Sequence, residues 1–123
     1  YNGNTVRAAK AGESWYTPYV EYCTANGIIK KTQFKSYDAD ITRGDMAIVF
    51  ANILPESEYT AVRSGDFPDI KSGDACKSAA QKLYRAGIVG GDTKGNYNAA
   101  NKITRAEACV IFTRLAAAEY RAK

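Results

Sequence analysis

A seven-residue stretch occurs twice in the chain, and this duplication constrains the fold more than any other feature. It covers residues 39–45 and 101–107, and each copy reads Ile-Thr-Arg, then a small residue, then an acidic residue. Thr42 precedes Asp45 by three positions and Thr104 precedes Glu107 likewise, which is the pattern of a helix capping box. The sequence therefore predicts two helices that are capped by Thr42 and Thr104.

The arginine that follows each threonine is not explained by capping. Arg43 and Arg105 would occupy the first helical position, where the helix dipole makes a cation unfavourable by up to about 1 kcal/mol unless an anion is near. Two interpretations stay open from the residues alone. Either each arginine and the helix amides bind a carboxylate or phosphate group, or each arginine pairs with an acidic side chain of the neighbouring repeat.

Four helices are expected, two in each half of the chain. The first begins near Ser14 or Thr17 and stops before Gly27, and the third stops before Gly87. The second and fourth begin at the capping threonines, and the second ends before Pro55. Apolar residues at helical spacing predict the buried faces of these four helices: Trp15, Tyr19, Tyr22 and Cys23; Met46, Val49, Phe50 and Ile53; Cys76, Ala79, Ala80 and Leu83; Ala108, Ile111, Phe112 and Leu115.

The chain is thus one unit written twice. We divide it into a lead-in or the end of a preceding repeat, a first repeat, a connector, a second repeat and a tail, which cover residues 1–12, 13–55, 56–66, 67–116 and 117–123. Repeats of this size enclose a core only with neighbours, and arrays commonly contain three or more units. Two repeats are therefore expected to be an incomplete set.

Charge and composition exclude several classes of function. The net charge is +4 and the pI is about 9.0, but the lysines and arginines are scattered, so nucleic-acid binding is not expected. Three cysteines and no histidine predict neither a disulfide framework nor a metal site, and each cysteine is expected to be a small core residue. Without histidine or suitably spaced carboxylates we expect no enzyme and no cofactor. No apolar run is long enough to span a membrane.

The motifs between the helices resemble the S-layer homology modules of bacterial cell-surface proteins. In the second half the resemblance rests on Phe67-x-Asp69, on residues 83–89, on the glycine-rich residues 91–97 and on residues 103–107. In the first half it rests on Trp15, residues 27–29, Phe34 and residues 41–45. Together these matches cover residues 13–116.

This resemblance implies an all-α fold of tandem helical repeats, packed as a pseudo-symmetric bundle that typically contains three repeats. Grooves between repeats would bind an acidic secondary cell-wall polysaccharide, often one that carries a pyruvate ketal. The module would then anchor an exported protein non-covalently to the cell wall or S-layer at the bacterial surface. The alternative is a protein-interaction or self-assembly module with no intact glycan pocket.

The resemblance also assigns roles to individual residues. Arg43 and Arg105 become anion ligands, and Trp15 becomes an aromatic that stacks on a sugar or forms the pocket wall, although it could equally be a core anchor. Asp69 would bind a sugar hydroxyl, hold a neighbouring arginine or cap a turn. Gly27 and Gly87 would permit the turn below the groove and offer backbone amides.

Several positions depart from the family pattern. Ala75 replaces the aromatic in the second repeat, and Arg7 replaces the acidic residue ahead of the first. Gly44 stands for the usual alanine, and Lys31 stands where the second repeat has a glycine. We therefore expect one good groove at most, formed where Arg43 or Trp15 faces the second repeat.

Overall fold

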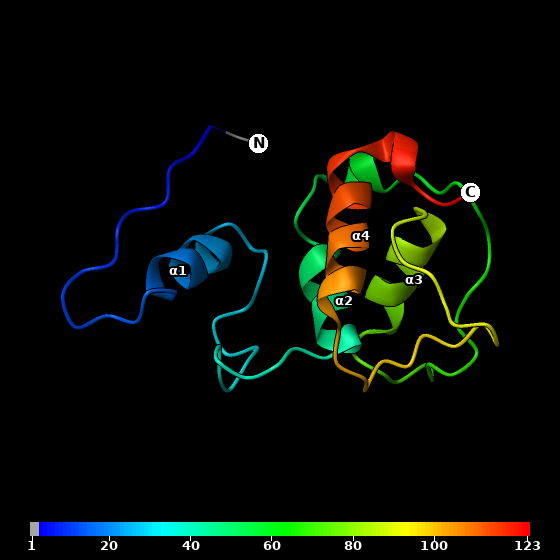
Figure 1. Ribbon diagram of the computed structural model, residues 1–123, viewed down its shortest axis with the longest axis horizontal. Helices are drawn as coiled ribbons and strands as arrows, with labels where there is room; N and C mark the ends of the chain where they lie inside the picture. The colour runs from blue at the N-terminus through cyan, green and yellow to red at the C-terminus, as the bar shows by residue number, and fades with distance from the viewer. Residues whose placement is uncertain (1–2) are drawn as a thin grey trace. The chain divides into compact units, whose positions relative to one another are not determined.

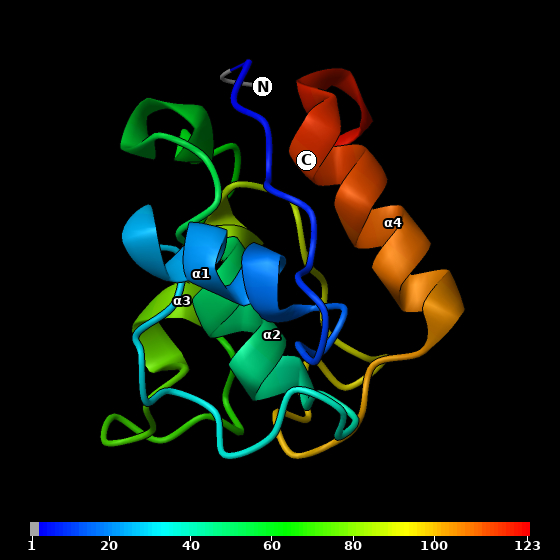
Figure 2. The ribbon, with the colours of Figure 1, turned by 90° about the vertical axis from the view of Figure 1, so that its left-hand side faces the viewer.

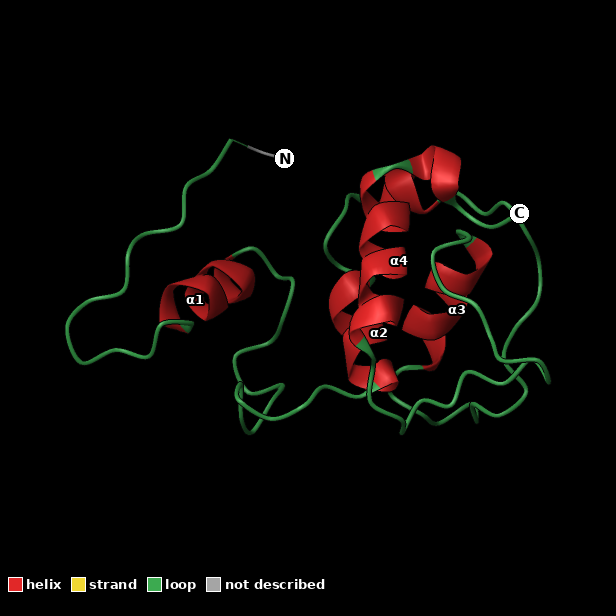
Figure 3. Cartoon of the chain, viewed as in Figure 1, coloured by secondary structure: helices red, strands yellow, loops and turns green. Residues whose placement is uncertain are grey.

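The computed structural model describes residues 3–123, so the first two residues of the predicted lead-in lie outside the described range. Helices are the regular elements within this range, and it contains no strand (Figure 3). The all-α class is therefore confirmed. The α-helices are α1 (Thr17–Ala25), α2 (Arg43–Phe50), α3 (Lys77–Arg85) and α4 (Arg105–Ala116), and two short 3₁₀ helices are η1 (Glu56–Tyr59) and η2 (Ala118–Tyr120).

The chain folds as two compact units whose boundary lies inside the first sequence repeat. One unit ends at Ala39 and contains α1, and the other covers Asp40–Lys123 and contains the remaining helices. Helix α2, which closes the first repeat in sequence, therefore packs with α3 and α4 of the second repeat (Figure 1). The compact unit and the sequence repeat are out of step by one helix.

The first unit is built on α1, which begins with Pro18 in its first turn and ends at a glycine, as the sequence predicts. Gly27 adopts the left-handed φ of +71°, and the amide of Ile28 donates to the carbonyl of Cys23 at 2.9 Å. The predicted buried face is wrong for Trp15 and Tyr19, which are 75% and 55% exposed. Their rings contact one another instead, with centroids 6.4 Å apart, because α1 is the only helix of its unit.

In the second unit the core forms where α2 packs on α3. Met46 and Ala47 of α2 are buried together with Ala80 and Leu83 of α3, and each is at most 2% exposed. The two alanines let the helix backbones approach closely, so they rather than larger residues occupy the contact. The helices face their neighbours along this line, which is why two other predicted core residues, Ile53 and Phe112, are 38% and 54% exposed.

Aromatic residues from the loops complete this core. The ring of Phe67, in the segment before α3, lies 4.7 Å from that of Tyr97 and 4.8 Å from that of Tyr84. Tyr59 of η1, a helix that the sequence did not predict, donates its hydroxyl to the carbonyl of Phe50 and accepts from the amide of Leu54. These contacts attach the connector and the glycine-rich loop to the helices.

Gly87 ends α3 at a point where the C-terminal segment packs directly on it. Its φ is +73°, and its carbonyl accepts from the amide of Ala122 at 2.9 Å. A Cβ atom at Gly87 would lie 2.3 Å from the Ala122 carbonyl oxygen. Glycine is therefore required here both by the backbone conformation and by the absence of space. Figure 2 shows α4 along its length, with η2 following its C-terminal end.

Substitution of Gly87 separates these two requirements. We expect Gly87→Ala to lower the free energy of unfolding by about 2 kcal/mol or more, because it adds a steric overlap to the left-handed strain. Gly95→Ala is the matched control, since Gly95 has a φ of +81° in the same unit but open space around it, and we expect it to lose only about 1 kcal/mol. Urea denaturation followed by circular dichroism measures both; equal losses would contradict the steric argument.

Candidate functional site

The two copies of the duplicated motif lie side by side in the second unit. The amide of Arg43 donates to the carbonyl of Asn101 at 2.7 Å, and the amide of Gly44 donates to the carbonyl of Ala99 at 2.9 Å. A Cβ atom at Gly44 would lie 3.2 Å from the Cys76 sulfur, so the glycine permits this close approach. The first amides of α2 are therefore occupied by the backbone of the second repeat and are not available to an anion.

The threonines cap both helices. The Thr104 hydroxyl accepts from the Glu107 amide at 3.2 Å, and the Glu107 carboxylate accepts from the Thr104 amide at 2.8 Å, which makes a full capping box. The Thr42 hydroxyl accepts from the Asp45 amide at 3.1 Å. The shorter Asp45 carboxylate accepts from the Thr42 hydroxyl. Each motif copy therefore starts its helix through local contacts.

Arg43 connects the two repeats. Its Nη1 atom lies 2.5 Å from Glu107 Oε1, and its Nε atom donates to the carbonyl of Tyr97 at 2.8 Å. The guanidinium carbon lies 4.7 Å from the centre of the Tyr97 ring, and the Tyr97 hydroxyl donates to the carbonyl of Arg43. The Arg43 side chain is only 12% exposed. In this structure Arg43 thus makes the ion pair with the neighbouring repeat that the second interpretation describes.

The charges around Arg43 are adjusted by the same contacts. The pKa of the Glu107 carboxyl is lowered chiefly by the backbone amide and the hydroxyl of Thr104, and the Arg43 guanidinium lowers it further. The pKa of the Tyr97 hydroxyl is raised by burial, which the nearby Arg43 charge partly opposes. Glu107 is therefore ionised near neutral pH and neutralises the charge of Arg43.

Arg105 has a different environment, although its position in the motif is equivalent. Its side chain is exposed, and no hydrogen bond or ion pair joins it to another described residue. The amides of Arg105 and Ala106 likewise have no acceptor within residues 3–123. The second motif copy is thus exposed at the place where the first copy contacts the following repeat.

Asp69 holds the glycine-rich loop. Its Oδ1 atom accepts from the amide of Tyr97 at 2.8 Å and its Oδ2 atom from the amide of Asn98 at 2.7 Å. Trp15 and Gly27 belong to the first unit, and Gly87 is buried under the C-terminal segment. The ligand-binding roles of these residues stay predictions.

A cavity of about 570 Å³ lies in the second unit between the glycine-rich loop and α4. Its charged lining consists of Arg43, Asp92, Lys102, Glu107 and Arg114. Its walls also contain apolar side chains and asparagine amides: Ile88, Val89, Val110, Ile111, Asn96 and Asn98. Arg43 is the member of the predicted ligand set that lines this cavity; Arg105, Asp69 and Gly87 are absent from its lining.

The loop that forms one wall is held by Asp92. One of its carboxylate oxygens accepts from the amides of Lys94 and Asn96, both at 2.9 Å, and the other accepts from the Asn98 side chain at 3.0 Å. These bonds, with that from Asn98 the strongest, lower the pKa of the Asp92 carboxyl. The loop is therefore organised before any ligand binds.

Sequence reasoning missed Arg114 as a residue of this site. It lies on α4 seven positions after Glu107, and residues at that spacing share one helix face. This spacing was a usable signal, because it places Arg114 on the same side of α4 as an acidic residue of the motif. The asparagines of the loop carried no comparable signal.

The cysteine and membrane predictions can also be compared with the structure. Cys76 is buried as expected, Cys23 is partly buried, and Cys109 is exposed, so the predicted core role is wrong for Cys109. It lies on the side of α4 away from the core. Within residues 3–123 no cluster of His, Cys, Asp and Glu could hold a metal ion, and no helix there is long and apolar enough to cross a membrane.

The fold and the site define a protein of tandem helical repeats with a cavity where one repeat meets the next. A sequence model of the S-layer homology domain matches residues 9–47 and 66–109. Because these matches cover more than half of the sequence, the chain belongs to the S-layer homology domain family.

Three relatives differ in the proteins that contain the similar segment. The chain is 45% identical over 67 residues to a surface-layer 125 kDa protein of Lysinibacillus sphaericus, a match covering 54% of this chain and 5% of that protein. It is 30% identical over 104 residues to an amylopullulanase of Thermoanaerobacterium thermosulfurigenes, covering 83% and 5%. It is 31% identical over 98 residues to endo-1,4-beta-xylanase A of Thermoanaerobacterium saccharolyticum, covering 76% and 8%. The chain thus spans less than a tenth of each relative's length.

The two arginines of the motif offer a direct comparison. We expect Arg43→Gln to lower the free energy of unfolding by about 2 kcal/mol, because it leaves the Glu107 carboxylate and two backbone carbonyls without their donor. Arg105→Gln removes the same group from the equivalent but exposed position, and we expect a change within about 0.5 kcal/mol. Chemical denaturation of both variants measures the difference, and an equal effect would show that Arg43 does not join the repeats.

Proposed function

We propose that this chain anchors an exported protein to the bacterial cell wall by non-covalent binding of an acidic secondary cell-wall polysaccharide. The observation that carries this proposal is the cavity of about 570 Å³ at the junction of the repeats, which combines cationic, amide and apolar groups in an S-layer homology chain. Relatives named as a surface-layer protein and as two different enzymes share this segment. A role common to all of them is attachment, and we assign the chain no catalytic role.

The lining of the cavity suits an acidic sugar. The side chains of Ile88, Val89 and Val110 offer an apolar wall for the C–H face of a pyranose ring, and the amides of Asn96 and Asn98 offer partners for hydroxyl groups. A pyruvate ketal presents a methyl group and a carboxylate on one carbon. Such a group fits a site where an apolar wall adjoins a guanidinium, so a pyruvylated polymer is the ligand that we favour.

Co-sedimentation with purified wall sacculi tests the proposal. We expect the chain to pellet with intact sacculi and to stay in solution when the secondary polymer has been removed chemically. Ala106 lines the cavity, so Ala106→Trp should fill part of it and reduce pelleting, whereas Ala118→Trp places the same ring on exposed η2, outside the lining. Pelleting that is unaffected by polymer removal would contradict polysaccharide anchoring, and equal pelleting of the two variants would place the site elsewhere.

Self-association is a second candidate function, and the unequal motif copies favour it. The start of α2 is covered by the second repeat, while Arg105 and the first amides of α4 have no such cover among the described residues. A second molecule could supply that contact through its own first repeat, which would be a head-to-tail association.

Light scattering over a range of concentrations tests this candidate. Because the contact would be made at the exposed start of α4, we expect the apparent mass to rise with concentration and Arg105→Glu to suppress the rise, with Lys94→Glu as an exposed control of the same charge change. A chain that stays monomeric throughout would contradict self-association.

A further inference from the structure

The cavity is lined by five charged side chains, and four of them already have partners. Arg43 and Glu107 pair with each other at 2.5 Å. Asp92 accepts three hydrogen bonds within its own loop. Lys102 pairs with Asp40 at 2.7 Å, and both of these side chains are 70% exposed to solvent. None of these four groups is free to bind a ligand charge without giving up a contact that the structure shows.

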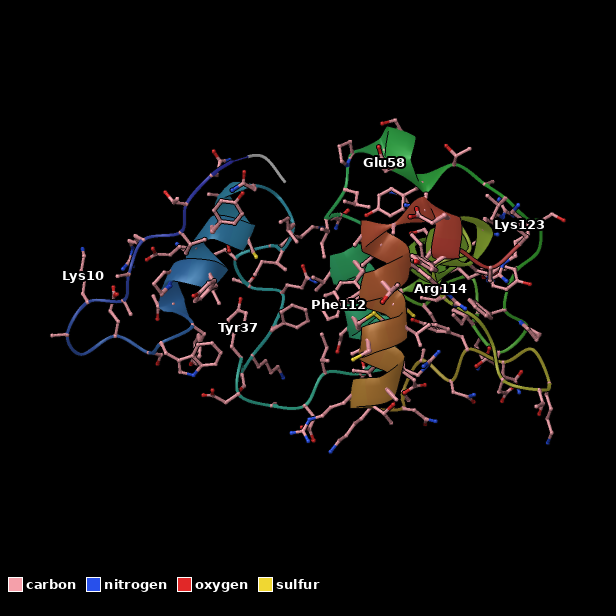
Figure 4. All side chains as sticks on the ribbon, turned by 45° about the horizontal axis from the view of Figure 1, so that its top comes forward. Lys10, Tyr37, Glu58, Phe112, Arg114 and Lys123 are labelled. Atoms are coloured by element: carbon pink, nitrogen blue, oxygen red, sulfur yellow. The ribbon has the colours of Figure 1, made fainter. Side chains whose placement is uncertain are left out.

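Arg114 is the exception. Its guanidinium makes one long hydrogen bond, from Nη1 to the carbonyl of Ile88 at 3.4 Å, and the side chain is half-buried. A guanidinium carries five N–H donors, so most of them have no partner among the described residues. Figure 4 shows Arg114 on α4, on the opposite side of the helix from Phe112. Because Ile88 also lines the cavity, this hydrogen bond places the Arg114 guanidinium at the cavity wall.

We propose that Arg114 binds the carboxylate of the acidic sugar, and that Arg43 shapes the site without binding the charge. The proposal rests on the anchoring function proposed above and identifies the residue that gives it selectivity for an acidic polymer. With Arg43 neutralised by Glu107 and Lys102 by Asp40, Arg114 is the unpaired cation at the wall. A half-buried guanidinium attracts a carboxylate more strongly than an exposed one and can bind it through two parallel hydrogen bonds.

The geometry disfavours both motif arginines for this role. Binding through Arg43 would require it to release Glu107 and the carbonyl of Tyr97, which together hold the two repeats in contact. Arg105 is exposed and does not line the cavity. Arg105 is therefore a matched control for Arg114, since both arginines lie on α4 and differ in whether they reach the cavity.

Calorimetric titration with the purified secondary polymer tests this assignment, with the same polymer after chemical reduction of its carboxyl groups as the neutral comparison. We expect the unaltered chain to bind the acidic polymer more tightly than the reduced one. Arg114→Gln should weaken binding of the acidic polymer by about tenfold or more and leave binding of the reduced polymer unchanged. Arg114→Lys keeps the charge without the planar fork and should recover part of the loss. Arg105→Gln should bind as the unaltered chain does.

The outcomes separate this inference from the function on which it rests. If the unaltered chain binds the acidic polymer and Arg114→Gln binds it equally well, the Arg114 assignment is overturned while anchoring stands. If the unaltered chain binds neither polymer, the proposed function fails and this inference fails with it. If Arg114→Gln loses both polymers equally, or if its circular dichroism differs from that of the unaltered chain while Arg114→Lys binds fully without the fork, the residue supports the fold and does not recognise the carboxylate.

Discussion

The contact between Arg43 and the second repeat is the interaction on which the compact unit depends. A guanidinium at a helix start is unfavourable beside the dipole, but here it lies over the Tyr97 ring and pairs with Glu107. Glu107 in turn caps α4, so one carboxylate both starts a helix and neutralises the cation of another repeat. An unpaired charge at 12% exposure would be strongly destabilising, which explains why each of these groups has a partner.

This arrangement also gives the cavity its shape. Arg43 donates to the carbonyl of Tyr97, and Asp69 accepts from the amide of the same residue, so the end of the glycine-rich loop is held from both sides. Asp92 organises the remainder of that loop. A wall built in this way is preorganised, and preorganisation lowers the cost of ligand binding. The residues most recognisable in the sequence therefore build the site, and a less obvious one, Arg114, is left to meet a charge.

The helices pack across the boundary between repeats. Helix α2 ends one repeat in sequence and packs on α3, which opens the next. In proteins of this kind each unit contacts its neighbours, so terminal elements lack half of their partners. The exposure of Trp15 before α1 and of Arg105 at the start of α4 has this common origin, since the equivalent positions inside the second unit are covered.

The sequence by itself determined the all-α class, the four helices and their ends. Those features depend on contacts within a few residues, such as the bond between Thr104 and Glu107 or the left-handed glycine at the end of α3, and so they leave local patterns. The tertiary structure alone decided which face of each helix is buried and which of two identical arginines is paired. Arg43 meets Glu107 across 64 positions of sequence, and no local pattern encodes a contact of that separation. The same limit hid Arg114, whose role depends on a loop folded against its helix.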